Sequence, residues 1–393
     1  MMFKNLSKKI TAGITAAALG FSLTFSAPAV VEASSNNNTA VSIAGTIISA
    51  TIQYNQLNKE MKALDTTEEG RTQLYEHYQK EMGVNNDPTL NARLDKIMSN
   101  LTRAVGKVDS SIYDKPYKYF ISNKEDLNAA CSMGHVMVVN TGTFNLLTTD
   151  DEIAAIVGHE MGHGQKDHVI KGSKKQLNKM VIAQLGAAAA GGGTLASVVA
   201  SVTANNSIAH GNRKYETEAD NMAWEYILRS DYNIGACAAV MQKISELYGE
   251  KYNANILNPA SHPDTGKRRD NYANKLYEYS GNHVSAKDGV ITINGKTFTT
   301  VAAANSMSSA ERSYFVLGNL AKAYHNIKTL PAATVSNGTV YLGYMEIMTP
   351  AADDEDAYVL AERLTELINT PAPTKDDKKS DKKDKKSSSK KAA

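Results

Sequence analysis

The stretch from Thr149 to His163 reads TDDEIAAIVGHEMGH and decides how this chain folds. Thr149, with Glu152 three residues later, forms a capping box, which predicts the start of a helix. Apolar residues with helical spacing follow the box. His159 and His163 are four residues apart, so both side chains lie on one face of this predicted helix.

Two imidazoles on one helical face can bind a single metal ion, and Zn²⁺ accepts imidazole nitrogen readily. Glu160 follows the first histidine and does not share its face, so it can reach the open side of the metal rather than bind it. A catalytic zinc site keeps one position for water and lowers the pKa of that water, and a carboxylate then takes its proton. The pattern predicts one zinc ion per chain, with Glu160 as general base.

A third ligand is expected from the stretch ETEAD, residues 216–220. Glu216 and Asp220 are four residues apart, so Glu216 can bind the metal while Asp220 accepts the far N–H of a ligand histidine. Taken alone, the stretch would be read as an ordinary charged helix face. The histidine pair upstream favours the metal site instead. Glu218 points about 200° away from Glu216 on a helix and is left out of the site.

The first 33 residues have the features of a signal peptide. Three lysines near the start precede an apolar stretch from Ile10 to about Phe25, and small residues follow up to Ala33. A retained membrane anchor is the alternative. We expect cleavage after Ala33 and a protein that is periplasmic or secreted.

Charge along the chain argues against nucleic-acid binding. The chain has 43 basic and 41 acidic residues, yet residues 375–393 alone carry nine lysines and four aspartates, so the body is net negative. The tail from Thr370 has almost no apolar residues and is predicted to be disordered. It is either a solubilising tether or a segment that binds anionic envelope surfaces.

The predicted fold class is α+β. Residues 40–110 are predicted as helices, and strands are predicted at 117–122 and 136–140. The uncharged segment 180–204 is rich in glycine and alanine, which favours two buried helices over a membrane span. After residue 286, a hairpin around Asn294-Gly295 and a helix are followed by a second hairpin and helix, which predicts a small ββαββα domain of two related halves.

Four segments follow from these observations. Residues 1–33 are the signal peptide, 34–286 a mainly helical zinc peptidase domain with a small sheet at the active site, 287–369 the small α+β domain, and 370–393 the Lys-rich tail. The chain, with 393 residues, is long enough for two modest hydrophobic cores.

Several further motifs occur in a fixed order around the histidine pair. They are Asn128-Ala129-Ala130, Thr141-Gly142, the acidic helix start at 150–152, His168, Arg213, Glu216 with Ala219 and Asp220, and Ser261-His262-Pro263 with Arg268. In this, residues 70–275 resemble the gluzincin metallopeptidases that include the heat-shock protease HtpX and the CAAX prenyl proteases. The soluble periplasmic members of the β-barrel-assembly-enhancing type are particularly similar. The resemblance implies peptide-bond hydrolysis by a zinc enzyme of the cell envelope, acting in protein quality control.

Two departures from the family pattern concern the substrate. The family commonly has Pro-Gly-Gly where this chain has Met133-Gly134-His135, and its partner-binding repeat arrays are absent here. His135 is interpreted as a polar side chain on a strand surface, with contact to substrate as the alternative. An extended substrate is expected to add to the edge strand around residues 136–140.

His262 precedes a proline and is therefore expected in an extended loop. The resemblance implies a position over the zinc, either as a plug in the fourth coordination site or as a donor to the oxyanion. His168 is interpreted as a structural or supporting residue on another part of the histidine helix. Cys131 and Cys237 are either a disulfide or two buried thiols.

We therefore expect a zinc-dependent endopeptidase of the cell envelope that acts on polypeptides, including misfolded envelope proteins. One alternative is an envelope binding module with a closed, non-catalytic zinc site. Such a site has four protein ligands and no use for Glu160, so this residue favours the enzyme. A zinc hydrolase of non-peptide bonds is a second alternative.

Overall fold

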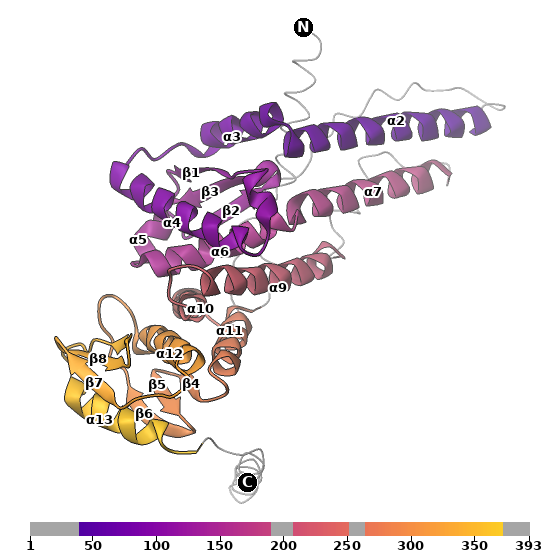
Figure 1. Cartoon of the computed structure of the whole chain (residues 1–393). Coiled ribbons are helices and arrows are strands. Elements are labelled where there is room, and N and C mark those ends of the chain that lie inside the picture. Colours follow the sequence, from indigo (N-terminus) through magenta and orange to yellow (C-terminus); the bar gives the residue numbers. More distant parts are fainter. Residues whose placement is uncertain (1–38, 190–206, 251–263, 372–393) are drawn as a thin grey trace, which may run out of the picture. The chain divides into compact units, whose positions relative to one another are not determined.

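The structure is a computed structural model that describes residues 39–189, 207–250 and 264–371 (Figure 1). The described residues form two compact units, one made of 39–189 and 207–230 and the other of 231–250 and 264–371. Helices with small sheets confirm the α+β class. The predicted signal peptide, most of the Lys-rich tail, and His262 lie outside the described residues.

A three-stranded sheet lies at the centre of the first unit. It contains β1 (Lys118–Ser122), β2 (Ala129–Ser132) and β3 (Val136–Asn140), in the order β1-β3-β2. β3 pairs with β1 in parallel and with β2 antiparallel, and all five of its residues are buried. The expectation that β3 is an edge strand open to substrate is therefore wrong. β2 is the edge strand on the side of the histidine helix, against which it packs.

Helices cover this sheet. The predicted N-terminal helices are α2 (Thr39–Thr66), α3 (Glu68–Met82) and α4 (Pro88–Gly106). Apolar residues of α2 and α3 form one buried cluster with Phe120 of β1, Val136 and Val138 of β3, and the start of α7. Because side chains alternate along a strand, Met137 and Val139 face the other side of the sheet. Short segments join the larger elements: η1 (Ser110–Tyr113), η2 (Met133–His135) and α5 (Thr141–Leu146).

Three further helices build the site. α6 (Asp150–Gln165) starts with the predicted capping box of Thr149 and Glu152. It ends before Asp167, which has a left-handed backbone (φ 53°), and α7 (His168–Ala189) starts in a new direction. α9 (Ser207–Leu228) packs along α6, as Figure 1 shows. Among the described residues, no helix combines the length and apolar character needed to cross a membrane.

The second unit contains helices and two small sheets. Its elements are α10 (Ala236–Tyr248), α11 (Thr265–Tyr279), β4 (Val284–Lys287), β5 (Val290–Ile293), β6 (Lys296–Thr300), α12 (Ser309–Asn326), β7 (Ala333–Ser336), β8 (Thr339–Leu342), β9 (Met345–Met348) and α13 (Ala357–Ile368). Each half is thus a three-stranded antiparallel sheet followed by a helix. The ββαββα prediction lacked the first strand of each half, β4 and β7.

Both halves share local details that support a common origin. Tight turns with positive φ connect the first two strands of each, at Asp288-Gly289 and Asn337-Gly338. Both sheets also have a register irregularity between the second and third strands. α10 and α11 pack on α12, so this compact unit begins at Asp231 rather than at residue 287. The boundary between the predicted peptidase domain and the predicted small domain, at 286/287, stays a prediction.

Candidate metal centre

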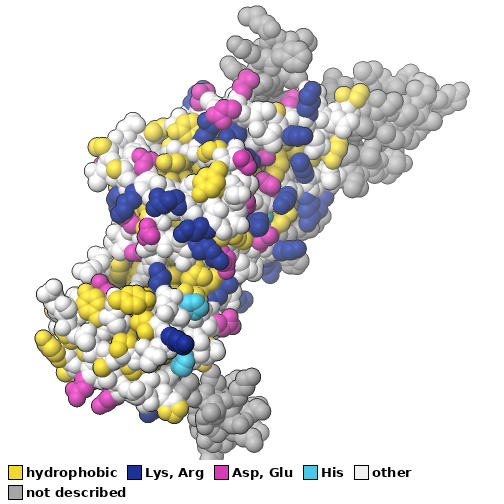
Figure 2. All heavy atoms as spheres, viewed as in Figure 1, with side chains coloured by type: hydrophobic (Ala, Val, Ile, Leu, Met, Phe, Trp, Pro, Cys, Tyr) yellow, Lys and Arg dark blue, Asp and Glu magenta, His cyan; other side chains and the backbone are white. Residues whose placement is uncertain are grey.

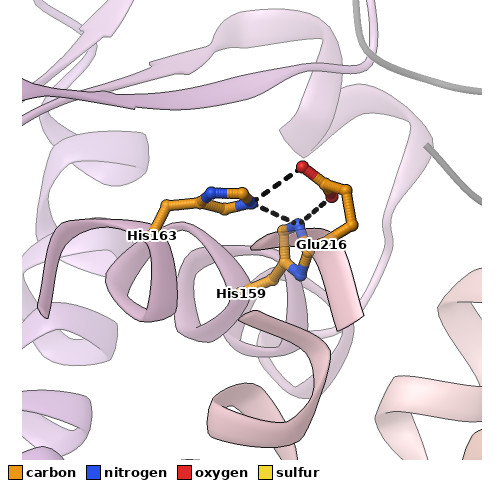
Figure 3. A group of neighbouring side chains, drawn as sticks. All are labelled: His159, His163 and Glu216. Atoms are coloured by element: carbon orange, nitrogen blue, oxygen red, sulfur yellow. Dashed lines mark hydrogen bonds and ion pairs between the residues drawn. The ribbon is translucent and has the colours of Figure 1, made fainter. Parts of the chain in front are cut away.

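Three side chains from two helices converge in the first unit (Figure 3). His159 Nε2 lies 3.2 Å from His163 Nε2 and 3.2 Å from Glu216 Oε2. His163 Nε2 lies 3.2 Å from Glu216 Oε1. Across the described part of the chain, this is the one group of at least three His, Cys, Asp or Glu side chains with ligand atoms this close together.

The close packing of α6 and α9 brings these side chains together. The histidines are one helical turn apart on α6, and Glu216 lies on the facing side of α9. Gly162 makes the approach possible: a Cβ placed there would lie 3.0 Å from the Ala219 carbonyl oxygen and 3.1 Å from Ala219 Cα. The small residues of the two motifs, and not only the charged ones, thus set the geometry.

The donor atoms fit a zinc ion. Bonds of 2.0–2.1 Å in a tetrahedral site place neighbouring donors about 3.3 Å apart. The 3.2 Å between the two imidazole nitrogens, and the 3.2 Å from each of them to one oxygen of Glu216, match this value. Two imidazole nitrogens and one carboxylate oxygen are also a donor set of known catalytic zinc sites, which leave the fourth position for water.

Asp220 lies where the sequence places it, behind the first histidine. Its Oδ1 is 2.9 Å from His159 Nδ1. A carboxylate can only accept, so His159 donates from Nδ1 and its Nε2 lone pair faces the cluster. His159, Glu216 and Asp220 are all at most 9% exposed, so water screens their interactions weakly.

Glu160 points from α6 towards the edge strand. Its Oε2 accepts a hydrogen bond from the backbone N–H of Cys131 in β2, at 3.0 Å. This bond fixes one carboxylate oxygen and leaves the other for proton transfer. Glu160 does not belong to the three-residue cluster, in agreement with the role of a base rather than a ligand.

Neither cysteine forms a disulfide: Cys131 and Cys237 are buried thiols in different units. Burial, and next the Glu160 carboxylate, raise the pKa of the Cys131 thiol. It is therefore neutral and poorly nucleophilic, although its backbone touches the base.

One contact behind the cluster, between His168 and Glu218, was not predicted from the sequence. His168 Nε2 lies 3.2 Å from Glu218 Oε2, and His168 Nδ1 lies 3.0 Å from His163 Nδ1. Burial, and next the neighbouring His163, lower the pKa of His168 to about 4. Neither residue belongs to the three-residue cluster, and His168 has the supporting position expected for it, but it starts α7 rather than continuing α6, which ends at Gln165.

His135 is neither on a strand surface nor in the cluster. It is 5% exposed, stacks on Tyr117 with ring centroids 4.5 Å apart, and donates from Nδ1 to the Lys115 carbonyl oxygen at 2.8 Å. Its backbone is left-handed, with φ 53°. Burial, and next the Lys115 charge, lower the pKa of His135 to about 4.

Comparison with known proteins agrees with this geometry. Residues 88–274 match peptidase family M48. The metalloprotease LoiP of Escherichia coli is 27% identical over 161 residues, which are 40% of this chain and 62% of LoiP. The mitochondrial metalloendopeptidase OMA1 of Arabidopsis thaliana is 27% identical over 157 residues, 39% of this chain and 30% of OMA1.

The β-barrel assembly-enhancing protease of Escherichia coli is 22% identical over 167 residues, 40% of this chain and 33% of that protein. The chain thus spans less than two thirds of each of these three relatives. The matched region contains the whole cluster, from His159 to Asp220, and the edge strand β2. Through this region, the chain is similar to peptidase family M48.

Proposed function

We propose that this protein is a zinc-dependent metalloendopeptidase. The observation that carries the proposal is the cluster of His159, His163 and Glu216 on two packed helices: the two imidazole Nε2 atoms lie 3.2 Å apart, and each lies 3.2 Å from one oxygen of the Glu216 carboxylate. A carboxylate that is not one of the ligands, Glu160, follows the first histidine. The match of residues 88–274 to a peptidase family makes the peptide bond the expected target.

When bound, zinc would supply a Lewis acid for the scissile carbonyl and lower the pKa of the attacking water. His159, His163 and Glu216 would hold it. Glu160 takes the proton of the water at its Oε1, because its Oε2 accepts from Cys131 N–H, and then passes the proton to the leaving amine. Asp220 keeps His159 oriented throughout.

An extended polypeptide would bind along the outer edge of β2. The N–H of Cys131 points to Glu160 and away from β3, so its C=O also points outward. Two residues earlier, Ala129 presents both its N–H and its C=O on the same edge. A substrate strand that pairs there runs past Glu160, which favours cleavage of flexible or unfolded chains.

The envelope setting is part of the proposal. The features of the first 33 residues favour export to the periplasm or beyond. One relative is named for enhancing β-barrel assembly, which is compatible with protein quality control in the envelope. Acidic and basic side chains are interspersed on the face of the molecule shown in Figure 2, which fits protein rather than nucleic-acid substrates.

The test is cleavage of unfolded casein by the mature protein, with and without a zinc chelator. We expect cleavage that the chelator abolishes and that added Zn²⁺ restores. Metal analysis of the same sample should give one zinc per chain. Bound zinc without cleavage of casein or other unfolded proteins would contradict the proposal and favour a non-catalytic binding module.

His262 also belongs to this proposal, on the resemblance of Ser261-His262-Pro263 to a family loop. We propose that His262 plugs the metal in the resting enzyme, since an exported protease benefits from staying inactive until substrate opens the site. His262→Ala should then raise casein cleavage. A fall in kcat of about 10²–10³ with little change in KM would instead show a donor to the oxyanion.

A further inference from the structure

We infer that Glu218 positions the second metal-binding histidine, His163, through His168. This rests on the proposed metal site and assigns it a supporting carboxylate that does not touch a ligand. Glu218, His168 and His163 form one continuous chain of contacts from a partly exposed carboxylate to the cluster.

The contacts run through three helices. Glu218 Oε2 of α9 lies 3.2 Å from His168 Nε2 of α7, and His168 Nδ1 lies 3.0 Å from His163 Nδ1 of α6. The far nitrogen of His163, Nε2, lies in the cluster, 3.2 Å from Glu216 Oε1. Every ring nitrogen of both histidines therefore faces a polar partner.

The chemistry of these partners fixes where the protons are. A carboxylate only accepts, so His168 donates from Nε2 and, as a neutral ring, has its lone pair on Nδ1. His163 must then donate from Nδ1 to that lone pair. This leaves the lone pair of His163 on Nε2, directed at the cluster, as a metal ligand requires.

Packing holds the intermediate ring in place. His168 is 4% exposed and stacks on Tyr215 of α9, with ring centroids 4.3 Å apart and an interplanar angle of 17°. Its position depends on the left-handed Asp167, which redirects the chain between α6 and α7. A merely space-filling residue would not need both ring nitrogens aligned with polar atoms.

The two ligand histidines are thus supported in related ways. Asp220 holds His159 directly, at 2.9 Å, and Glu218 holds His163 through one additional imidazole. Removal of such supporting groups typically lowers metal affinity about 10–100-fold. Because Glu218 acts through a second ring, we expect its removal to lower metal affinity about tenfold, near the lower end of this range.

The first test is competition for Zn²⁺ between a chelator and the mature protein. We expect Glu218→Ala to weaken zinc binding about tenfold, and Glu218→Gln to stay within about threefold of the unmodified protein, because the amide oxygen accepts the same hydrogen bond. Glu225→Ala is the matched control. Glu225 is on the same helix and pairs with the nearby Arg229 rather than with a residue of the cluster, so zinc affinity should not change.

The second test reads the proton positions by ¹⁵N NMR of the histidine rings in the metal-free protein. We expect His163 protonated on Nδ1 and His168 on Nε2, and mixed tautomers for both in Glu218→Ala but not in Glu218→Gln. Unchanged tautomers and unchanged zinc affinity in Glu218→Ala would overturn the inference, as would equal losses in the Ala and Gln variants.

These tests separate this inference from the proposed function. Failure of the unmodified protein to bind Zn²⁺ would contradict the proposed function, while the tautomers of the metal-free protein would still decide the role of Glu218. Tight zinc binding that does not depend on Glu218 would contradict only the positioning role.

Discussion

The backbone at His135 adopts a conformation that L-residues rarely take. Its φ is 53°, at the position where similar peptidases commonly have the second glycine of Pro-Gly-Gly. Here the stack on Tyr117 and the hydrogen bond to Lys115 offset the strain. The histidine at this position therefore has a structural role, and it is too buried to contact a substrate.

Acid should destabilise the fold through this buried ring. The folded pKa of His135, about 4, is below the unfolded value of 6.5, so the unfolded chain binds the extra proton between these values. Stability should fall as the pH is lowered from 6.5 to 4, by at most about 3 kcal/mol from this residue.

His135→Asn is the variant for this test, because asparagine tolerates a left-handed backbone and does not titrate in this range. Urea unfolding at several pH values measures the free energy of unfolding. We expect the variant to be less stable at pH 7 and the difference to shrink towards pH 4. A constant difference across the range would contradict the role of this histidine.

At the residue scale, the sequence predicts the two pairs that build the site well because helical spacing determines each pair. His159 with His163, and Glu216 with Asp220, are pairs four residues apart within single helices. The His168–Glu218 contact could not be predicted in this way, since it joins different helices, α7 and α9, beyond the helix break at Asp167.

The site depends on the contact between helices α6 and α9. Two glycines of α6, Gly158 and Gly162, lie at this contact, and the space around them differs. A Cβ at Gly158 would lie 3.9 Å from Ala223 Cα, an ordinary contact, whereas one at Gly162 would lie 3.0 Å from the Ala219 carbonyl oxygen. Because backbone atoms obstruct a side chain at 162, α9 would have to shift and carry Glu216 with it.

Gly158→Ala and Gly162→Ala therefore make a matched pair. The first should be neutral or stabilise by up to about 1 kcal/mol, the helix propensity gained over glycine. The second should lower both the melting temperature and the zinc affinity. Equal zinc affinity in the two variants would show that the spacing of the helices does not set the donor geometry.

At the element scale, the errors concern strands. The uninterrupted run of apolar residues in β3 is typical of a central strand buried on both faces, while the edge strand β2 is short and consists of small residues. β4 and β7 were missed, although Asp288-Gly289 and Asn337-Gly338 are strong hairpin signals. Helices were easier because their periodicity extends over longer segments.

On the scale of the whole molecule, the family match ends at residue 274, inside the second compact unit. The helix α10 and much of α11 thus belong to the matched region, although they pack with α12 and β4 of the first βββα half. The fold class and the resemblance to the family could be predicted from the sequence. The start of the second compact unit, at Asp231, could not, because it depends on contacts between helices that no local pattern encodes.

Deletion of residues 371–393 should leave both units intact. This segment consists mostly of Lys, Asp, Ser and Ala and has no large apolar side chain to bury. Melting temperature and casein cleavage should equal those of the full mature chain. A fall of several degrees in melting temperature would show that the tail packs on the body.

The central claim is that this chain cleaves peptide bonds with a metal held by His159, His163 and Glu216 and with Glu160 as base. The most direct measurement is the rate of casein cleavage by Glu160→Gln at full zinc occupancy. Because glutamine can still accept the Cys131 N–H but cannot take a proton, we predict an unchanged zinc content and a rate lower by about 10²–10⁴-fold. A zinc-loaded Glu160→Gln protein that cleaves casein at the rate of the unmodified enzyme would contradict the account.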